Sequence, residues 1–336
     1  MEAFFLKIWY QKKRHFITYL LMPFSWIYWF ISQLRRFYLL KIKNQEKLDI
    51  PIIVIGNISL GGVGKTPLVC YLYQKLKEQG LTPGIVSRGY ARQDLNDKII
   101  SEKDNAKTVG DEPWMLYQRL KAPMAVATKR LNAVKLLIKN FPKVDIILSD
   151  DGLQHYKMPR DIEIVVIDGK RGLGNGLIFP AGPLRESVSR LKDVDFVIVN
   201  GELKDNKLKN KINYKTMNLN PEILINLKTG EKRKVSQLVA KKIIAVSGIG
   251  NPKRFFQSLE SLGYEVVEKA FPDHYTFREE DLKLDKFLPI IMTEKDAVKC
   301  RSFAKEYMWY LEINAHLDHQ LLNEMNKIIK DIKHEE

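Results

Sequence analysis

The sequence contains only two cysteines, Cys70 and Cys300, among its 336 residues. They show no metal-binding spacing and no disulfide framework, so they favour a reducing compartment and two small buried side chains. No internal repeat or low-complexity tract stands out. Hydrophobic residues make up 45% and charged residues 28% of the chain, as in ordinary folded proteins. A chain of this length is expected to form about two domains.

Acidic residues are in the minority, and the deficit is largest at the amino terminus. The chain has 55 lysines and arginines against 40 aspartates and glutamates, which gives a formal charge of +15. Eight of the basic residues and one acid, Glu2, lie in residues 1–45. An excess of this kind attracts nucleic acid, anionic lipid or phosphorylated substrates. Because much of the surplus flanks a hydrophobic stretch, we expect a lipid partner and no nucleic acid.

The hydrophobic stretch carries no charge from Phe16 to Leu34. It approaches the roughly 20 apolar residues that a spanning helix needs, but Pro23 weakens that interpretation. No small-residue cleavage site follows it, which argues against a signal peptide. The alternatives are an interfacial helix or hairpin with its tryptophans at headgroup level, and an amphipathic helix packed on its own domain. We expect residues 1–45 to be membrane-associated, with spanning left open.

A glycine-rich loop follows this segment. The apolar run at 51–56 predicts a buried strand, SLGGVGKT follows, and a helical pattern extends from Pro67 to about Gln79. In this context backbone N–H groups point at phosphate oxygens, Lys65 bridges the β- and γ-phosphates, and Thr66 gives its hydroxyl to Mg²⁺. Ser59 stands where the motif usually has its first glycine, so the loop is a variant. The expected nucleotide-binding residues are Ser59, Leu60, Gly61, Gly62, Val63, Gly64, Lys65 and Thr66.

Two carboxylates end a second apolar run. Asp150 and Asp151 follow the run at 144–148 directly, which places them at the carboxyl edge of a predicted parallel strand. Carboxylates at this edge suit Mg²⁺, either as direct ligands or through water. A capped turn before Gly152 is the alternative interpretation. Beside the glycine-rich loop, we expect Asp150, Asp151 and Thr66 to form the metal site.

Further motifs narrow the kind of nucleotide-binding protein that the glycine-rich loop indicates. They occur in the order SRGY (87–90), GDEP (110–113), DDGLQH (150–155), RGLGNG (171–176), PAGPLRE (180–186), FPDHY (271–275) and TEKDAVK (293–299). The ordered set resembles the tetraacyldisaccharide 4′-kinases, the lipid A 4′-kinases of Gram-negative bacteria, from the hydrophobic segment to about residue 312. Departures are few: Ser187 replaces a common proline, and Leu153 and Leu173 replace frequent aromatics.

The resemblance implies the reaction and the place of the enzyme. It implies MgATP-dependent phosphorylation of the 4′-hydroxyl of an acylated glucosamine disaccharide 1-phosphate, on the cytoplasmic face of the inner membrane. We expect ATP and Mg²⁺ as cofactors, membrane lipid and the lipid substrate as partners, and a monomer. Cations are needed for the substrate phosphate, and the shaped loop around PAGPLRE is expected to bind ligand. The candidate substrate residues are Arg88, Arg130, Arg171, Asn175, Arg185 and Glu186.

A sugar hydroxyl is a poor nucleophile, so a kinase commonly provides a carboxylate to accept its proton. The resemblance pairs Asp111 of GDEP with His274 of FPDHY, and a histidine in contact with an aspartate orients it and tunes its proton affinity. With Lys65, these are the expected catalytic residues. The alternative for Asp111 is a helix N-cap before Pro113, and that for His274 is an ordinary histidine in an Asp-rich turn.

Strand-like runs alternate with helical stretches, which predicts an α/β fold: a P-loop domain with a parallel, doubly wound sheet, plus a second, smaller α/β lobe and the amino-terminal membrane-associated helix. The segment 212–227 is a candidate two-stranded connector. The expected divisions are 1–45, 46–210, 211–229 and 230–336. The strand-like runs lie at 51–56, 83–87, 123–127, 144–149, 162–168, 194–199, 242–247, 289–293 and 308–313.

The chief alternative function is a membrane-associated P-loop NTPase switch, in which hydrolysis drives binding and no phosphorylated product forms. A GTP-binding switch is expected to carry an N/T-K-x-D motif, and the TEKD at Thr293 has its lysine one position late. We therefore favour the kinase.

Overall fold

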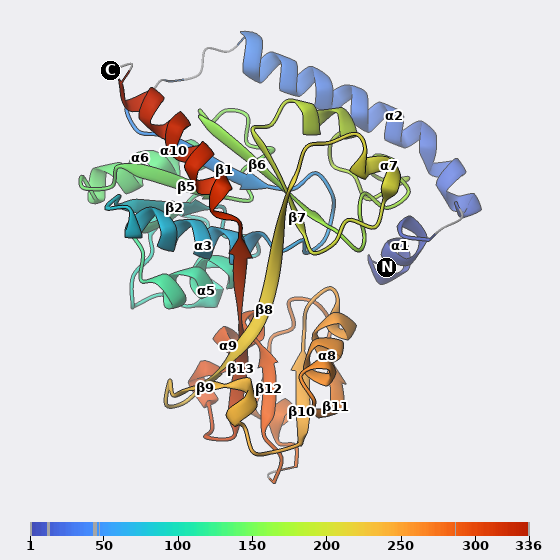
Figure 1. Ribbon diagram of the computed structural model, residues 1–336, viewed down its shortest axis with the longest axis vertical. Helices are drawn as coiled ribbons and strands as arrows, with labels where there is room; N and C mark the ends of the chain where they lie inside the picture. Colours follow the sequence, from blue (N-terminus) through green and yellow to red (C-terminus); the bar gives the residue numbers. More distant parts are fainter. Residues whose placement is uncertain (1, 12–13, 43–45, 47, 286, 335–336) are drawn as a thin grey trace.

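The structure is a computed structural model that describes residues 2–11, 14–42, 46, 48–285 and 287–334 (Figure 1). Its described strands form one 13-stranded sheet in the order β11-β10-β12-β13-β8-β7-β6-β1-β5-β2-β4-β3, with β9 paired to β8. The strands are β1 (Ile52–Gly56), β2 (Pro83–Ser87), β3 (Lys98–Ile99), β4 (Met124–Val126), β5 (Ile146–Asp150), β6 (Ile162–Asp168), β7 (Phe196–Asn200), β8 (Lys215–Asn226), β9 (Lys232–Lys234), β10 (Lys242–Ser247), β11 (Glu265–Ala270), β12 (Ile290–Thr293) and β13 (Met308–Leu317).

Ten α-helices accompany the sheet among the described residues. They are α1 (Glu2–Trp9), α2 (Phe16–Phe37), α3 (Lys65–Glu78), α4 (Ala106–Val109), α5 (Asp111–Leu120), α6 (Arg130–Asn140), α7 (Asn206–Lys209), α8 (Pro252–Ser261), α9 (Glu294–Cys300) and α10 (His319–His334). All nine predicted strand runs contain a strand, and the predicted α/β class is confirmed.

The upper half of the sheet is parallel except for β3, which pairs antiparallel with β4, and it is covered on both faces. β1 lies between β5 and β6 and pairs with both in parallel. Alternate residues of β1 point to opposite faces: Ile53 and Ile55 pack with α3 and α5, whereas Ile52 and Val54 pack with α6. A strand that is buried on both faces needs the continuous apolar run that the sequence has at 51–56.

Two long antiparallel strands, β8 and β13, connect the lower lobe to the P-loop domain (Figure 1). β8 continues from a parallel pairing with β7 into an antiparallel pairing with β13. The predicted two-stranded connector at 212–227 is therefore a single strand, and its partner comes from the end of the chain. In the lobe, α8 packs on one face of β10–β12 and α9 on the other.

The last helix returns to the P-loop domain. Leu321, Leu322 and Met325 of α10 belong to the same hydrophobic cluster as Leu68 and Leu72 of α3. The expected boundary at 230 placed this helix with the smaller lobe, but its apolar face packs in the core of the larger one.

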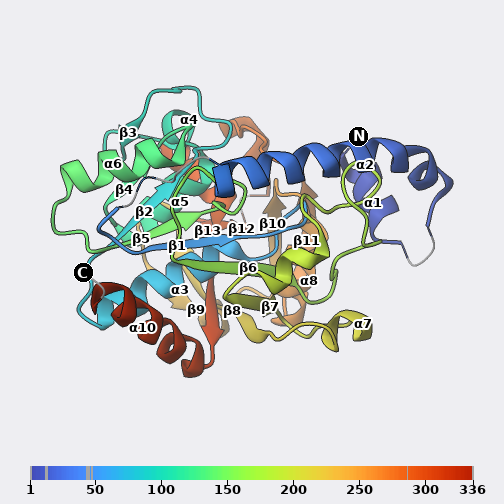
Figure 2. The same ribbon diagram turned by 90° about the horizontal axis from the view of Figure 1, so that it is seen from above.

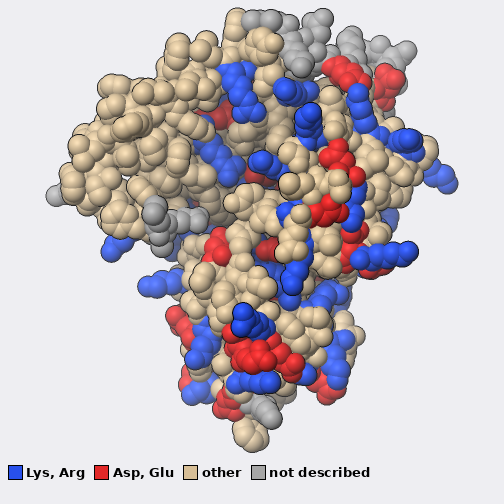
Figure 3. All heavy atoms as spheres, turned by 180° about the vertical axis from the view of Figure 1, so that it is seen from behind, with Lys and Arg blue, Asp and Glu red and all other residues tan. Residues whose placement is uncertain are grey.

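The amino-terminal helices lie outside the sheet layers, and α2 runs along the edge of the P-loop domain (Figures 1 and 2). One side of α2 faces the protein, where Thr18 and Ser25 are buried. The other side exposes large apolar residues, and Figure 3 shows a broad area without charged side chains at this corner. The exposed apolar residues of the segment include Phe16, Leu20, Phe24, Trp26, Ile27, Phe30, Ile31 and Leu34. No described helix is both long and apolar enough to cross a membrane.

Candidate active site

The glycine-rich loop connects β1 to α3. Gly61 and Gly64 have φ angles of +101° and +99°, which residues with a side chain rarely adopt. Gly64 is the N-cap of α3, so Lys65 and Thr66 lie in the first turn of the helix. The helix therefore begins two residues before the predicted start at Pro67. Free N–H groups at a helix N-terminus form an anion-binding site. The local geometry that a phosphate-binding loop requires is therefore present.

Two buried asparagines hold the loop in shape. The amide of Asn57 donates to the carbonyls of Ser59 and Gly61, and its Oδ1 accepts from Lys65 Nζ at 3.1 Å. Asn200, at the end of β7, donates to the carbonyl of Val63 at 3.0 Å. Neither residue was predicted from the sequence, although a polar residue directly after a buried apolar strand is a signal for Asn57.

The two aspartates after β5 have opposite environments. Asp150 is 2% exposed, and burial together with the charges of Glu112 and Asp151 raises its pKa to about 7. Asp151 has a φ of +48° and lies 3.3 Å from Lys65 Nζ. Burial acts to raise the pKa of Asp151, but Lys65 and Arg185 outweigh it and hold the pKa at about 2. Asp151 is thus paired with the loop lysine, whereas Asp150 is buried and its raised pKa disfavours the charged form.

The candidate substrate arginines have different surroundings. Arg130, at the start of α6, is buried and donates to the carbonyl of Asp150, and burial lowers its pKa to about 10. Arg185 pairs with Asp151 at 3.5 Å. Arg171 stacks 5.5 Å above the ring of Tyr10, and Arg88 is exposed. Arg130 therefore supports the backbone at Asp150. The side chains of Arg88, Arg171 and Arg185 remain accessible to solvent.

Asn175 and Glu186 are occupied by hydrogen bonds within the protein. Asn175 donates to the carbonyl of Ala181 at 2.8 Å and accepts from the N–H of Leu177 at 3.1 Å. Glu186 is buried and accepts from Gln154 at 2.7 Å and from Tyr156. These bonds shape the PAGPLRE loop.

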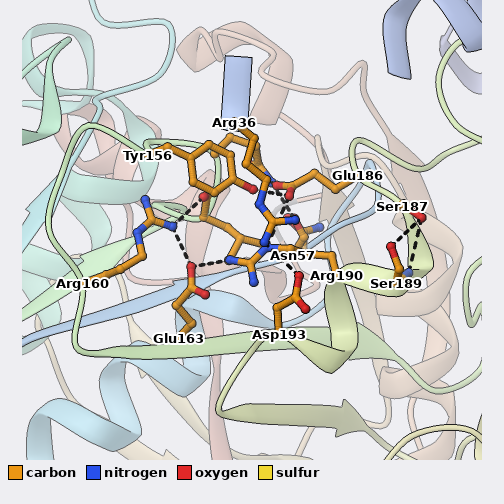
Figure 4. Close-up of polar contacts among 12 residues, drawn as sticks. Arg36, Asn57, Tyr156, Arg160, Glu163, Glu186, Ser187, Ser189, Arg190 and Asp193 are labelled. Atoms are coloured by element: carbon orange, nitrogen blue, oxygen red, sulfur yellow. Dashed lines mark hydrogen bonds and ion pairs between the residues drawn. The ribbon is translucent and has the colours of Figure 1, made fainter. Parts of the chain in front are cut away.

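A polar network links this loop to α2 (Figure 4). The guanidinium groups of Arg36, Arg160 and Arg190 lie 4.8–5.9 Å from the ring centre of Tyr156. Arg36, at the end of α2, pairs with Asp193 at 2.9 Å. On the other side of the network, Gln154 donates to Glu186 and to the carbonyl of Asn57. The amino-terminal helix is thereby connected to the phosphate-binding loop through a chain of side-chain contacts.

Asp111 and His274 come together although 163 residues separate them in sequence. Asp111 is the first residue of α5, His274 lies in the turn after β11, and Nδ1 of the imidazole is 3.2 Å from Asp111 Oδ2. The N-cap of α5 is Gly110, so the structure gives Asp111 no capping role. Glu112 is close enough to Asp150 to raise the pKa of that carboxyl. The pair therefore lies beside the carboxylates of the phosphate-binding site.

Two lysines at this site had no role in the sequence analysis. Lys295 and Lys299 belong to the TEKDAVK motif, and Lys299 Nζ lies 3.9 Å from Asp111 Oδ2. Lys295 Nζ lies 3.5 Å from His274 Nε2. The i, i+4 spacing of the two lysines was the available signal, because it places both on one face of a helix.

Comparison with known proteins identifies the family. The family model of tetraacyldisaccharide-1-P 4′-kinase matches residues 17–330. A tetraacyldisaccharide 4′-kinase of Shewanella woodyi is 45% identical, over 98% of this chain and 97% of that protein. One of Legionella pneumophila strain Corby is 46% identical, over 95% of each. The crystal structure of LpxK from Aquifex aeolicus in complex with ATP superimposes with a TM-score of 0.78 at 28% identity, covering 94% of this chain and 99% of that one. The chain belongs to the tetraacyldisaccharide 4′-kinase family, as its ordered motifs had indicated.

Proposed function

We propose that this kinase transfers the γ-phosphoryl group of ATP to the 4′-hydroxyl of an acylated glucosamine disaccharide 1-phosphate. The observation that carries the proposal is the contact between Asp111 and His274 beside the carboxylates of a phosphate-binding loop. A switch that only hydrolyses nucleotide needs no second acid–base pair for an alcohol. Family membership supports the substrate class.

The residues around the loop fit MgATP. Asp150 Oδ1 is buried and accepts no hydrogen bond within the described part of the chain, and a buried carboxylate oxygen of this kind is a suitable donor for a hard cation. No three histidine, cysteine or acidic side chains of the described residues converge on one point, so Thr66, phosphate oxygens and water would complete the set. When bound, Mg²⁺ neutralises charge on the phosphates. Asp150, Asp151 and Thr66 would hold it.

The protein side chains then have distinct tasks. Lys65 holds negative charge on the transferred phosphoryl group and is itself positioned by Asn57. Asp111 accepts the proton of the attacking hydroxyl, because a carboxylate at hydrogen-bond distance can act as the base. His274 orients that carboxylate through Nδ1. The proton therefore leaves the hydroxyl oxygen as that oxygen bonds to the γ-phosphorus, while the bond from that phosphorus to the bridging oxygen breaks and ADP leaves.

The exposed face of α2 supports attachment to the membrane from which a lipid substrate is taken. Trp26 and Phe30 are 64% and 58% exposed and lie one helical turn apart. Arg35 follows in the last turn and is exposed, so it can meet anionic headgroups, whereas Arg36 is held by Asp193. We place the protein, as a monomer, on the cytoplasmic face of the inner membrane.

Product analysis tests the proposal. Purified protein is incubated with γ-labelled ATP and an acylated disaccharide 1-phosphate in detergent, and the lipids are separated by thin-layer chromatography. The expected product is a labelled disaccharide bisphosphate, with Lys65→Ala as the inactive control. Release of labelled inorganic phosphate without labelled lipid would instead support the NTPase switch.

A further inference from the structure

Helix α9 presents two lysines to the Asp111–His274 pair from the side of the smaller lobe. The lysines, Lys295 and Lys299, are 17% and 8% exposed, so both ammonium groups are largely removed from water. A buried charge of this kind needs fixed partners. Each lysine meets a different member of the pair.

Lys299 connects the turn that carries His274 to Asp111. Its Nζ donates to the carbonyl of Tyr275 at 3.1 Å and lies 3.0 Å from Asp296 and 3.9 Å from Asp111. Asp296 is itself fully buried and accepts from the N–H of Gly248 and the hydroxyl of Thr293. The lysine therefore has little freedom to move.

The turn needs such support. His274 has a φ of +58°, in the left-handed region that few residues with a side chain adopt. The contact from Lys299 to the carbonyl of Tyr275 fixes the backbone next to this residue. A shift of this turn would move the imidazole away from Asp111.

Lys295 meets the opposite edge of the imidazole. Its Nζ lies 3.5 Å from His274 Nε2, 3.4 Å from Glu112 and 3.8 Å from Asp273. An ammonium group has donors but no acceptor, so it favours a ring nitrogen that carries no proton. The proton of the neutral imidazole then lies on Nδ1, where it is directed at Asp111.

We propose that Lys295 and Lys299 are positioning residues for the proton transfer: Lys299 holds the Asp111 carboxylate and the His274 turn in place, and Lys295 selects the Nδ1–H tautomer. The inference rests on the proposed role of Asp111 as proton acceptor. The charged and titratable groups around the pair are Lys295, Asp296 and Lys299 of α9, Glu112 of α5, Asp273 of the turn, and Tyr90, whose ring centre lies 5.5 Å from that of His274.

Steady-state kinetics from pH 5 to 9 test the role of Lys299. Lys299→Met should lower kcat at neutral pH about 10- to 100-fold and leave the KM for ATP unchanged, because Asp111 and the His274 turn then lose the ammonium group that holds them in register. Lys299→Arg should recover most of kcat. The matched control is Lys305→Met, a lysine of the same lobe that pairs with Glu279, and it should behave as wild type.

The Asp111→Asn background separates this inference from the proposed function. There, Lys299→Met should cause little further loss, because coupled residues are non-additive. A full additional loss there, or near-normal kcat of Lys299→Met in the Asp111-intact protein, would overturn the inference alone. If Asp111→Asn itself keeps near-normal kcat, the proton-acceptor role fails first and the inference with it.

Lys299→Met leaves the buried Asp296 without its lysine partner and can therefore destabilise the fold. Lys295→Met leaves that ion pair intact and so provides a second, independent test. Nitrogen NMR of histidine-labelled protein should report an unprotonated Nε2 for His274 in wild type and a rise in the Nε2–H form in Lys295→Met. The same variant should lower kcat severalfold with an unchanged KM for ATP. An unchanged tautomer in the variant would show that Lys295 does not select it.

Discussion

The exposed side of α2 gives a prediction whose size follows from the structure. Trp26 and Phe30 are about 60% exposed, and a large aromatic side chain can bury about 200 Å². Each ring therefore offers about 120 Å², worth about 3 kcal/mol at about 25 cal/mol per Å² if it is fully removed from water. An interfacial helix buries only part of its apolar face, so we take half of this value.

The double variant Trp26→Ser/Phe30→Ser should therefore lose about 3 kcal/mol of membrane affinity, which is about 100-fold in the partition coefficient. Cosedimentation with vesicles that contain anionic phospholipid measures this coefficient. Folding should change little, because both side chains are directed away from the protein core. The matched control is Phe287→Ser, which removes an aromatic ring that is 95% exposed in the smaller lobe.

Equal vesicle binding by the double variant and wild type would refute the reasoning about α2. Equal loss by the double variant and Phe287→Ser would refute it as well, because any exposed aromatic ring would then contribute. A loss confined to the α2 variant, with an unchanged melting temperature, would agree with an interfacial helix. Activity on a detergent-dispersed substrate should fall less than activity on substrate in vesicles.

Three further predictions concern the phosphate-binding site. Lys65→Ala should lower turnover by several orders of magnitude, since it removes charge stabilisation worth about 3–5 kcal/mol, and near-normal turnover of a folded variant would contradict the assignment. Asn57→Ala should weaken ATP binding about tenfold in a titration, because it removes the hydrogen bond that holds Lys65 and leaves the carbonyls of the loop unpaired; unchanged affinity would count against this role. The pKa of Asp150 is raised from 3.8 to about 7, so the nucleotide-free fold is favoured below about pH 4 and loses stability as the pH rises to about 7, by up to about 4 kcal/mol. Asp150→Asn should abolish this loss in denaturant unfolding at pH 5 and pH 8, and parallel losses in both proteins would contradict it.

The parts of the fold that the sequence predicted are those with a local signal. Apolar runs such as 51–56 and 162–168 become strands that are buried on both faces, and the glycine-rich loop lies between a strand and a helix as expected. β9 is made of lysines and arginine, and β11 exposes most of its residues, so neither carries an apolar pattern. The pairing of β8 with β13 joins segments about 90 residues apart, and no local pattern reports such a contact.

In the candidate site, too, the residues with a local sequence signal were predicted and the contacts that depend on the folded structure were not. The loop residues and the two aspartates were predicted from their spacing, but the opposite pKa shifts of Asp150 and Asp151 were not. They depend on the positive φ of Asp151, which turns its carboxylate toward Lys65, and on burial, which composition does not encode. The Asp111–His274 contact was expected only through the family resemblance, because it joins the two lobes. The approach of Lys295 and Lys299 depends on where α9 lies against α5, which motif order does not specify.

The proposed kinase activity depends most on Asp111 as the acceptor of the sugar proton. The direct measurement is a single-turnover transfer from γ-labelled ATP to acylated disaccharide 1-phosphate, comparing Asp111→Asn with wild type after ATP affinity has been measured for both. Asparagine keeps the size of the side chain and a polar contact to His274 but cannot accept the proton at the same oxygen. If Asp111 is the proton acceptor, Asp111→Asn should slow the transfer by about 100-fold or more, and its affinity for ATP should be nearly unchanged. Transfer at close to the wild-type rate by a folded, ATP-binding Asp111→Asn enzyme would contradict it.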